Sequence, residues 1–339
     1  MQHSTRPPQR FAAALAASAL AFAAAGCGRN STPDGAGAKT IKIGVSIPAA
    51  DHGWTGGVVY HAGEAKKAVE AANPGVRVIV STAATSAEQV DRVENLLVQG
   101  IDALVILPSE PAPLSGVCER AVKAGVKLVV VDRNLANPVQ HLLIAGDNPG
   151  FGRAAAEAIA KELEGKGSVV MMEGVQCDVN TDRVEAFKET LAKFPEIKIL
   201  DSGSADWNTE KGLKLMENFL QKHPLIDAVW TGDDDVSIGA LKAIEESGRK
   251  DIRTLVGGGG SKAIIKRVLD GDPLVKLTVT YPPAMIEAGV AEALKLLLPA
   301  AESADSDAGA DATAQTITIP AEIVDASNAQ QFYAPNSAY

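Results

Sequence analysis

The chain has 339 residues, about two domains at roughly 150 residues each, and 46% of them are hydrophobic, which excludes intrinsic disorder. Its formal net charge of -10 excludes a protein that works by neutralising nucleic-acid phosphates. Aromatic residues make up only 4% of the chain, so we expect a core of aliphatic side chains and alanine.

The first residues have the pattern of an export signal. Two arginines precede an apolar run, residues 11–25, that is too short to span a bilayer, and Cys27 follows. The pattern resembles a bacterial lipoprotein signal peptide. It predicts that residues 1–26 are removed and that Cys27 carries a lipid on the periplasmic or cell-surface side. Because Ala24 stands where leucine is commonest, secretory cleavage without lipidation remains the alternative.

Residues 27–39, rich in Gly, Ser and Pro, predict a flexible tether, and folded structure is expected from residue 40. Strand-like and helix-like segments then alternate. The expected strands are residues 41–47, 76–80, 103–107 and 128–131. The last two are apolar on both faces, which is typical of a parallel sheet between helices. Thr85 and Glu88 form a capping box for a helix that Gly100 ends.

The same alternation continues beyond Asp147. The expected strands are residues 169–172, 197–200, 228–231, 254–256 and 275–280. Residues 94–105 and 217–230 also repeat one helix-to-strand unit, Glu-Asn followed by Ile-Asp-Ala. The pattern predicts the α/β class, with two doubly wound parallel-sheet lobes of one topology. The acidic, small-residue stretch 300–314 is expected to be a flexible insertion.

Polar and aromatic residues gather where these strands end, which is where open α/β sheets bind ligands. The candidates are Asp51, His52, Trp54, Asp132, Arg133, Arg183, Trp207, Asp233, Gly259, Thr280 and Tyr281. Carboxylates accept hydrogen bonds from hydroxyls, guanidinium groups donate them in a fork, and aromatic faces cover C–H surface. The combination predicts a site for a small polyhydroxylated ligand.

Several of these residues have a purely structural alternative. Asp132 and Asp233 would each cap the segment that follows, and Asp234 and Asp235 are interpreted as caps and helix-dipole partners. Trp230, inside a strand, is expected in the core. Cys118 and Cys177 are interpreted as free thiols; they are the two cysteines besides Cys27.

Enzyme motifs are mostly missing. The glycine run 257–260 is followed by Ser261 and Lys262, the wrong order for a phosphate-binding loop. The sequence has no Gly-x-Ser-x-Gly elbow, dinucleotide fingerprint or paired zinc-ligand motif. We therefore expect no catalytic residue, no metal and no cofactor.

Short stretches along the chain match one known family. They are residues 43–48, 100–103, 131–133, 146–148, 183–187, 205–207, 223–229 and 237–241. Through them, residues 42–298 resemble the ribose-binding-protein-like substrate-binding components of bacterial ABC sugar importers, the type I periplasmic binding proteins.

The resemblance implies two lobes joined by a three-strand hinge, with the ligand clamped between them. The expected lobes are residues 40–146 plus 281–316 and residues 147–280 plus 317–339, with crossings near 146–147, 280–281 and 316–319. Asp132 and Arg133 would be the hydroxyl clamp of the first lobe, with Asp51 and Trp54 from its first loop. The second lobe would contribute Arg183, Trp207, Asp233 and Thr280.

The chain departs from the family pattern at four positions in or beside the expected site. Gly259 stands where an aspartate is usual, Asp233 where an asparagine is usual, Gly53 where a phenylalanine is usual, and Thr280 where a glutamine is usual. These changes predict a ligand other than ribose. The extra carboxylate of Asp233 and the space above Gly259 suit a polyol, a differently configured sugar or an amino sugar.

The expected function is that of an exported solute-binding protein that delivers a small carbohydrate to an inner-membrane ABC permease and its ATPase. A chemoreceptor is an optional further partner; nucleic acid is not expected, and contact with the membrane would be through the lipid alone. One alternative is an exported carbohydrate hydrolase using Asp51, His52 and the acids near Asp233. The other, a sugar-sensing effector domain of a regulator, is disfavoured because residues 1–40 hold a signal and tether rather than a DNA-binding helix-turn-helix.

Overall fold

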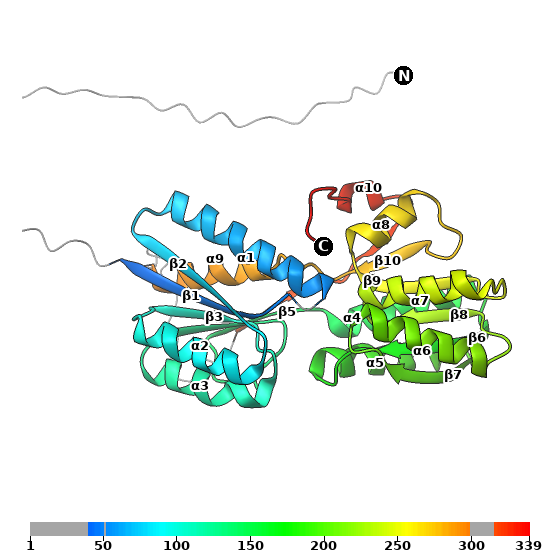
Figure 1. The fold of residues 1–339 in the computed structure, drawn as a ribbon, viewed down its shortest axis with the longest axis horizontal. Helices are drawn as coiled ribbons and strands as arrows, with labels where there is room; N and C mark the ends of the chain where they lie inside the picture. Colours follow the sequence, from blue (N-terminus) through cyan, green and yellow to red (C-terminus); the bar gives the residue numbers. More distant parts are fainter. Residues whose placement is uncertain (1–39, 51, 299–314) are drawn as a thin grey trace, which may run out of the picture. The chain divides into compact units, whose positions relative to one another are not determined.

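The structure is a computed structural model that describes residues 40–50, 52–298 and 315–339. It has two α/β lobes, each built on a six-stranded sheet (Figure 1). The predicted signal peptide, Cys27, the tether and the stretch 300–314 lie outside the described residues.

The first sheet is parallel throughout, in the order β11-β5-β4-β3-β1-β2. Its strands are β1 (Ile41–Pro48), β2 (Val76–Ala83), β3 (Ala103–Ile106), β4 (Lys127–Val131), β5 (Leu142–Gly146) and β11 (Gln315–Ile319). Helices α1 (Gly53–Ala72) and α9 (Met285–Leu297) cover one face, and α2 (Ser86–Val98) and α3 (Pro111–Lys123) cover the other. Strands covered on both sides explain the continuous apolar runs in the sequence.

The second sheet has the order β12-β10-β9-β8-β6-β7. Its strands are β6 (Lys166–Glu173), β7 (Glu196–Ser204), β8 (Ala228–Thr231), β9 (Thr254–Gly259), β10 (Leu277–Thr280) and the antiparallel edge strand β12 (Ile323–Asp325). Helices α4 (Asn148–Glu162) and α5 (Asp178–Leu191) pack on one face. On the other face lie α6 (Thr209–Lys222), α7 (Asp234–Ser247) and α8 (Lys262–Leu269), and the short α10 (Ala329–Phe332) packs on α8.

The two lobes share one topology, as the internal repeat predicted. The order β2-β1-β3-β4-β5 in the first sheet corresponds to β7-β6-β8-β9-β10 in the second. The repeated segments are equivalent, because residues 94–105 lead from α2 into β3 and residues 217–230 lead from α6 into β8. The doubly wound α/β prediction is confirmed, apart from the antiparallel edge strand.

The chain passes between the two sheets three times, after β5, after β10 and after β11. The strand β11 pairs with β5 along its whole length, through the pair Ile319 and Gly146. The first sheet therefore extends to Ile319, three residues beyond the expected lobe boundary at residue 316.

Local sequence signals set the element ends. Thr85 Oγ1 accepts a hydrogen bond from the Glu88 backbone N–H at 3.1 Å, and Gly100 after α2 has a φ of 70°, which favours glycine. Trp230 is fully buried and stacks on Phe187 with ring centroids 4.1 Å apart, which confirms its predicted place in the core. Cys118 and Cys177 are both free thiols.

Candidate ligand-binding site

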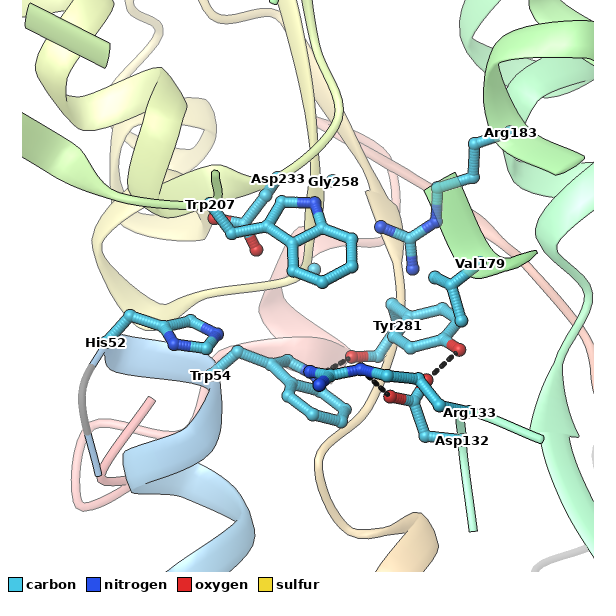
Figure 2. A pocket seen from close by; sticks show the side chains of 11 residues that line it. His52, Trp54, Asp132, Arg133, Val179, Arg183, Trp207, Asp233, Gly258 and Tyr281 are labelled. Carbon is cyan, nitrogen blue, oxygen red and sulfur yellow. Dashed lines mark hydrogen bonds and ion pairs between the residues drawn. The ribbon is translucent and has the colours of Figure 1, made fainter. Parts of the chain in front are cut away.

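Residues of both lobes and of one crossing segment surround a cavity of about 310 Å³ (Figure 2). Its lining residues are His52, Trp54, Asp132, Arg133, Val179, Arg183, Trp207, Asp233, Gly258, Gly259 and Tyr281. They follow the carboxyl ends of β1, β4, β6, β7, β8, β9 and β10 or belong to those ends.

Asp132 is held in an unusual backbone conformation at the end of β4. Its φ is 67°, a left-handed value that aspartate tolerates better than most residues, and its side chain is buried. The Tyr281 hydroxyl donates a hydrogen bond to Asp132 Oδ1 at 2.5 Å (Figure 2). Burial raises the pKa of the Asp132 carboxyl, and the neighbouring Arg133 charge opposes that rise. A strained, buried carboxylate in a cavity is typical of a functional group.

Arg133 lies between its own lobe and Trp207 of the other lobe. Its Nη1 donates a hydrogen bond to the Ser109 carbonyl oxygen at 2.8 Å, and its Nε lies 3.5 Å from Asp132 Oδ2. The guanidinium carbon is 5.5 Å from the centre of the Trp207 ring. The pair places a cation over an indole face across the cavity.

Arg183 enters the cavity from α5 and is fixed on several sides. Its Nε donates to Asn148 Oδ1 at 2.9 Å and its Nη1 donates to the Gly232 carbonyl oxygen at 2.8 Å. Its guanidinium carbon lies 4.2 Å from the ring centres of both Phe151 and Tyr281. The side chain is therefore preorganised, with donors still available in its fork.

Trp54 links three parts of the fold at the start of α1. Its backbone N–H donates to Asp235 Oδ2 at 3.2 Å in the second lobe, and its indole Nε1 donates to the Tyr281 carbonyl oxygen at 2.9 Å. Asp235, interpreted from the sequence as a cap of its own helix, thus accepts from the first turn of a helix in the other lobe. No sequence signal pointed to this contact.

Asp233 caps its own helix and also lies in the wall of the cavity. Its Oδ1 accepts from the Asp235 backbone N–H at 2.7 Å, which caps α7, and the residue also lines the cavity. Burial, followed by the nearby carboxylates of Asp235 and Asp234, raises the pKa of Asp233 well above its usual range. Burial also raises the pKa of Asp234 to about 6, although Ser261 N–H donates to it at 2.7 Å.

Three predicted site residues do not have the place in the cavity that the sequence predicted for them. Asp51 lies outside the described residues. Thr280 is not among the lining residues, because adjacent residues of an extended chain point to opposite sides and Tyr281 takes the inward position. The Oγ1 of Thr280 instead accepts a hydrogen bond from the Glu322 N–H at 2.9 Å. Gly259 lines the cavity, but the expected open space above it is filled, since a Cβ there would lie 2.1 Å from Tyr339 Oη.

Two lining residues were not predicted. Val179 belongs to the first turn of α5, and an apolar residue there gives no sequence signal for a site. Gly258 belongs to the glycine run at the end of β9, so the run itself was the available signal.

The cavity therefore combines two carboxyl groups, two guanidinium groups and three aromatic side chains. Carboxylate oxygens accept hydrogen bonds from hydroxyl groups, and guanidinium groups donate hydrogen bonds to them. Indole rings pack on the apolar face of a sugar. Among the described residues, no group of three or more His, Cys, Asp and Glu side chains is arranged to hold a metal ion.

Within the described part of the chain, every helix is too short or too polar to cross a membrane.

Comparison with known proteins agrees with this geometry. The family model for the periplasmic binding protein domain matches residues 43–301. The ribose import binding protein RbsB of Bacillus subtilis is 36% identical over 220 residues, which cover 64% of this chain and 70% of that protein. A xylitol-binding protein of Mycolicibacterium smegmatis is 30% identical over 186 residues, 54% of this chain and 53% of its own length.

A solved structure has the same architecture. The periplasmic binding protein component of the arabinose ABC transporter from Shewanella sp. ANA-3, bound to L-arabinofuranose, superimposes with a TM-score of 0.72 at 26% identity. The match covers 86% of this chain and 94% of that one. The two α/β lobes, the three crossings and the matched family model lead to one conclusion: the chain belongs to the type I periplasmic binding proteins and is similar to their ribose-binding members.

Proposed function

We propose that this protein captures a small carbohydrate between its two lobes and delivers it to an ABC importer. The observation that carries the proposal is the cavity in which carboxyl groups, guanidinium groups and indole faces converge from both lobes. Charge-assisted hydrogen bonds of about 1.5–3 kcal/mol each make a few such contacts sufficient for micromolar binding, about -8 kcal/mol.

The proposed ligand-binding residues are those that line the cavity. They are His52, Trp54, Asp132, Arg133, Val179, Arg183, Trp207, Asp233, Gly258, Gly259 and Tyr281. Asp132 and the two arginines would bind hydroxyl groups. Trp54, Trp207 and Tyr281 would cover the apolar face of the ring.

We propose a sugar, a polyol or an amino sugar as the ligand. Relatives named for ribose, xylitol and arabinose support a carbohydrate of this size. The raised pKa of Asp233 favours its protonated form, which can donate a hydrogen bond to a ligand oxygen. An ammonium group on the ligand would instead favour the ionised carboxylate, so binding of an amino sugar would depend on pH differently from binding of a neutral sugar.

Binding would couple to closure of the lobes about the three crossings. Contacts already join the lobes beside the cavity: Trp54 N–H with Asp235, and Asn134 N–H with Asp178 Oδ2 at 3.2 Å. A ligand that contacts both lobes adds its own contacts to these and so stabilises the closed form. The strand pairing supports lobes of residues 40–146 plus 281–319 and residues 147–280 plus 320–339.

Export and partners complete the proposal. We propose a signal peptide at residues 1–26, a lipid anchor on Cys27 and a location on the periplasmic or cell-surface side of the membrane. The partners would be the permease and its ATPase, with a chemoreceptor as an optional reader of the closed form. The protein would bind its sugar without catalysis; the named relatives are binding proteins, which favours this function over a hydrolase.

A thermal-shift screen tests the proposal. D-ribose, L-arabinose, xylitol, myo-inositol and D-glucosamine are added separately to the purified protein, and calorimetry measures the affinity of any sugar that raises Tm. A ligand at 100 times its Kd stabilises the folded state by about 2.7 kcal/mol. Chromatography after incubation should return the sugar unchanged; a cleaved or altered product would favour the hydrolase alternative.

Asp132→Asn should lower the affinity at least tenfold while keeping the fold, because asparagine also tolerates the φ of 67°. Asp182→Asn, which changes an exposed carboxylate beside Arg183, is the matched control and should bind normally. Failure of every sugar to raise Tm, or equal affinities of the two variants, would contradict the proposed function.

A further inference from the structure

Tyr339 lies at the junction of the two lobes, behind the wall of the ligand cavity. Its side chain is 8% exposed and packs in the core cluster that both lobes share. A Cβ on Gly57 of α1 would lie 2.9 Å from Tyr339 Cβ, and a Cβ on Gly259 of β9 would lie 2.1 Å from Tyr339 Oη. One tyrosine therefore contacts the first helix of one lobe and the cavity wall of the other.

The segment that carries Tyr339 is held in place by polar contacts. Lys262 Nζ donates to the Ser337 carbonyl oxygen at 2.7 Å, and the Tyr339 N–H donates to Ser337 Oγ at 3.1 Å. Lys262 begins α8 of the second lobe. The tyrosine is thus fixed to the lobe that provides Gly259.

Neighbouring residues of the glycine run line two different cavities. Gly259 lines the ligand cavity, whereas Tyr339 lines a second cavity of about 550 Å³ together with Gly260, Thr280 and Pro283. Because Gly259 has no side chain, the tyrosine ring takes the space that a side chain on residue 259 would occupy.

The Tyr339 hydroxyl is a buried polar group with no hydrogen-bond partner among the described residues. Buried hydroxyls are normally paired, so an unpaired one beside a ligand cavity points to a partner gained on binding. Burial, and then the carboxylates of residues 233–235, raise the pKa of the Tyr339 phenol. It therefore stays protonated and can donate.

We propose that Tyr339 is a specificity-determining residue of the carbohydrate site, whose ring limits ligand size beside Gly259 and whose hydroxyl donates a hydrogen bond to the ligand at that wall. The inference rests on the proposed function, because it concerns the same cavity. Nothing in the sequence near Tyr339 indicates this role; only the fold brings it to Gly259.

Calorimetry on matched ligand pairs tests the ring. D-ribose with D-allose and xylitol with sorbitol are suitable, since the members of each pair differ by one CHOH unit. In Tyr339→Ala the affinity for the six-carbon member should rise about tenfold or more relative to its five-carbon partner. Tyr339→Leu keeps part of the packing and should change the ratio in the same direction if the alanine variant does not fold.

Tyr339→Phe tests the hydroxyl. It should weaken the binding of the preferred sugar by about five- to tenfold. Tm without sugar should stay the same or rise, because the lost group is buried and unpaired. Tyr333→Phe, a partly exposed tyrosine six residues earlier, is the control and should bind as the wild type does.

The outcomes separate this inference from the proposed function. If the wild type binds a sugar but Tyr339→Ala and Tyr339→Leu keep its order of preference, the ring does not select ligands and the inference is wrong. Full affinity in Tyr339→Phe would equally overturn the role of the hydroxyl. Absence of binding by the wild type would instead overturn the proposed function.

Discussion

Gly152 of α4 packs directly against the backbone of α5 beside the site, and alanine there should disturb both folding and binding. A Cβ on Gly152 would lie 2.2 Å from the Arg183 carbonyl oxygen and 3.0 Å from the Phe187 nitrogen. Both are backbone atoms, so a side-chain rotation cannot relieve the overlap. Since ordinary Cβ contacts begin at 3.4 Å, α5 has to move by about 1 Å.

The expected destabilisation follows from two opposing effects. Overpacking of this kind costs about 1–3 kcal/mol, whereas replacing glycine by alanine inside a helix contributes about 1 kcal/mol of stability. We expect Gly152→Ala to lower the free energy of unfolding by up to about 2 kcal/mol. A shift of α5 would also move Arg183 out of its position between the rings of Phe151 and Tyr281, so sugar affinity should fall at least tenfold.

Gly63→Ala is the matched control. Gly63 also lies inside a helix, α1, but nothing lies within 4 Å of a Cβ built there. This variant should be more stable than the wild type by about 0.5–1 kcal/mol and should bind sugar normally. Urea unfolding followed by circular dichroism measures stability, and calorimetry measures affinity. If Gly152→Ala gained stability as Gly63→Ala does and kept its affinity, the close packing that positions Arg183 would be refuted.

Two further predictions concern buried groups of the site. The pKa of Asp234 is raised from 3.8 to about 6, so the folded state binds more protons between pH 4 and 6 and this carboxyl lowers stability as pH rises through that window, by about 3 kcal/mol in total. Asp234→Asn removes this effect, so its unfolding free energy relative to the wild type should rise between pH 4 and 6; a difference independent of pH would contradict the assignment. Trp207→Ala should weaken sugar binding about tenfold by calorimetry because the Arg133 guanidinium and the ligand both lose an aromatic face; unchanged affinity would assign Trp207 to packing alone.

Much of the fold is predictable from the sequence because each strand covered by helices on both sides must be apolar on both sides. The runs at residues 103–107 and 128–131 show this directly. The antiparallel β12 could not be predicted in the same way, since a three-residue edge strand has too little pattern to be distinguished from a loop.

The site is predictable to the extent that it depends on strand ends. Asp132, Arg133 and Asp233 follow strands β4 and β8, and parallel strands bring their carboxyl ends to one edge. The choice between Thr280 and Tyr281 was not accessible, because it depends on which of two adjacent side chains turns inward where the chain leaves β10.

Contacts between distant segments could not be predicted at all. Asp235 accepts from Trp54 across the lobes, and Tyr339 occupies the space beside Gly259. Each pair is separated by many residues and carries no periodic pattern. Such juxtapositions depend on the relative placement of whole elements, which one sequence does not specify residue by residue.

The placement of the three tryptophans makes intrinsic fluorescence a suitable probe of the cavity. Trp54 and Trp207 line the cavity, whereas Trp230 stacks on Phe187 in the core of the second lobe. Sugar entry would change the surroundings of the first two indoles and leave the third as a constant background to the fluorescence. In the variant Trp230→Phe both remaining indoles, Trp54 and Trp207, would line the sugar cavity. A change in the tryptophan fluorescence of this variant would then report sugar binding and closure of the lobes.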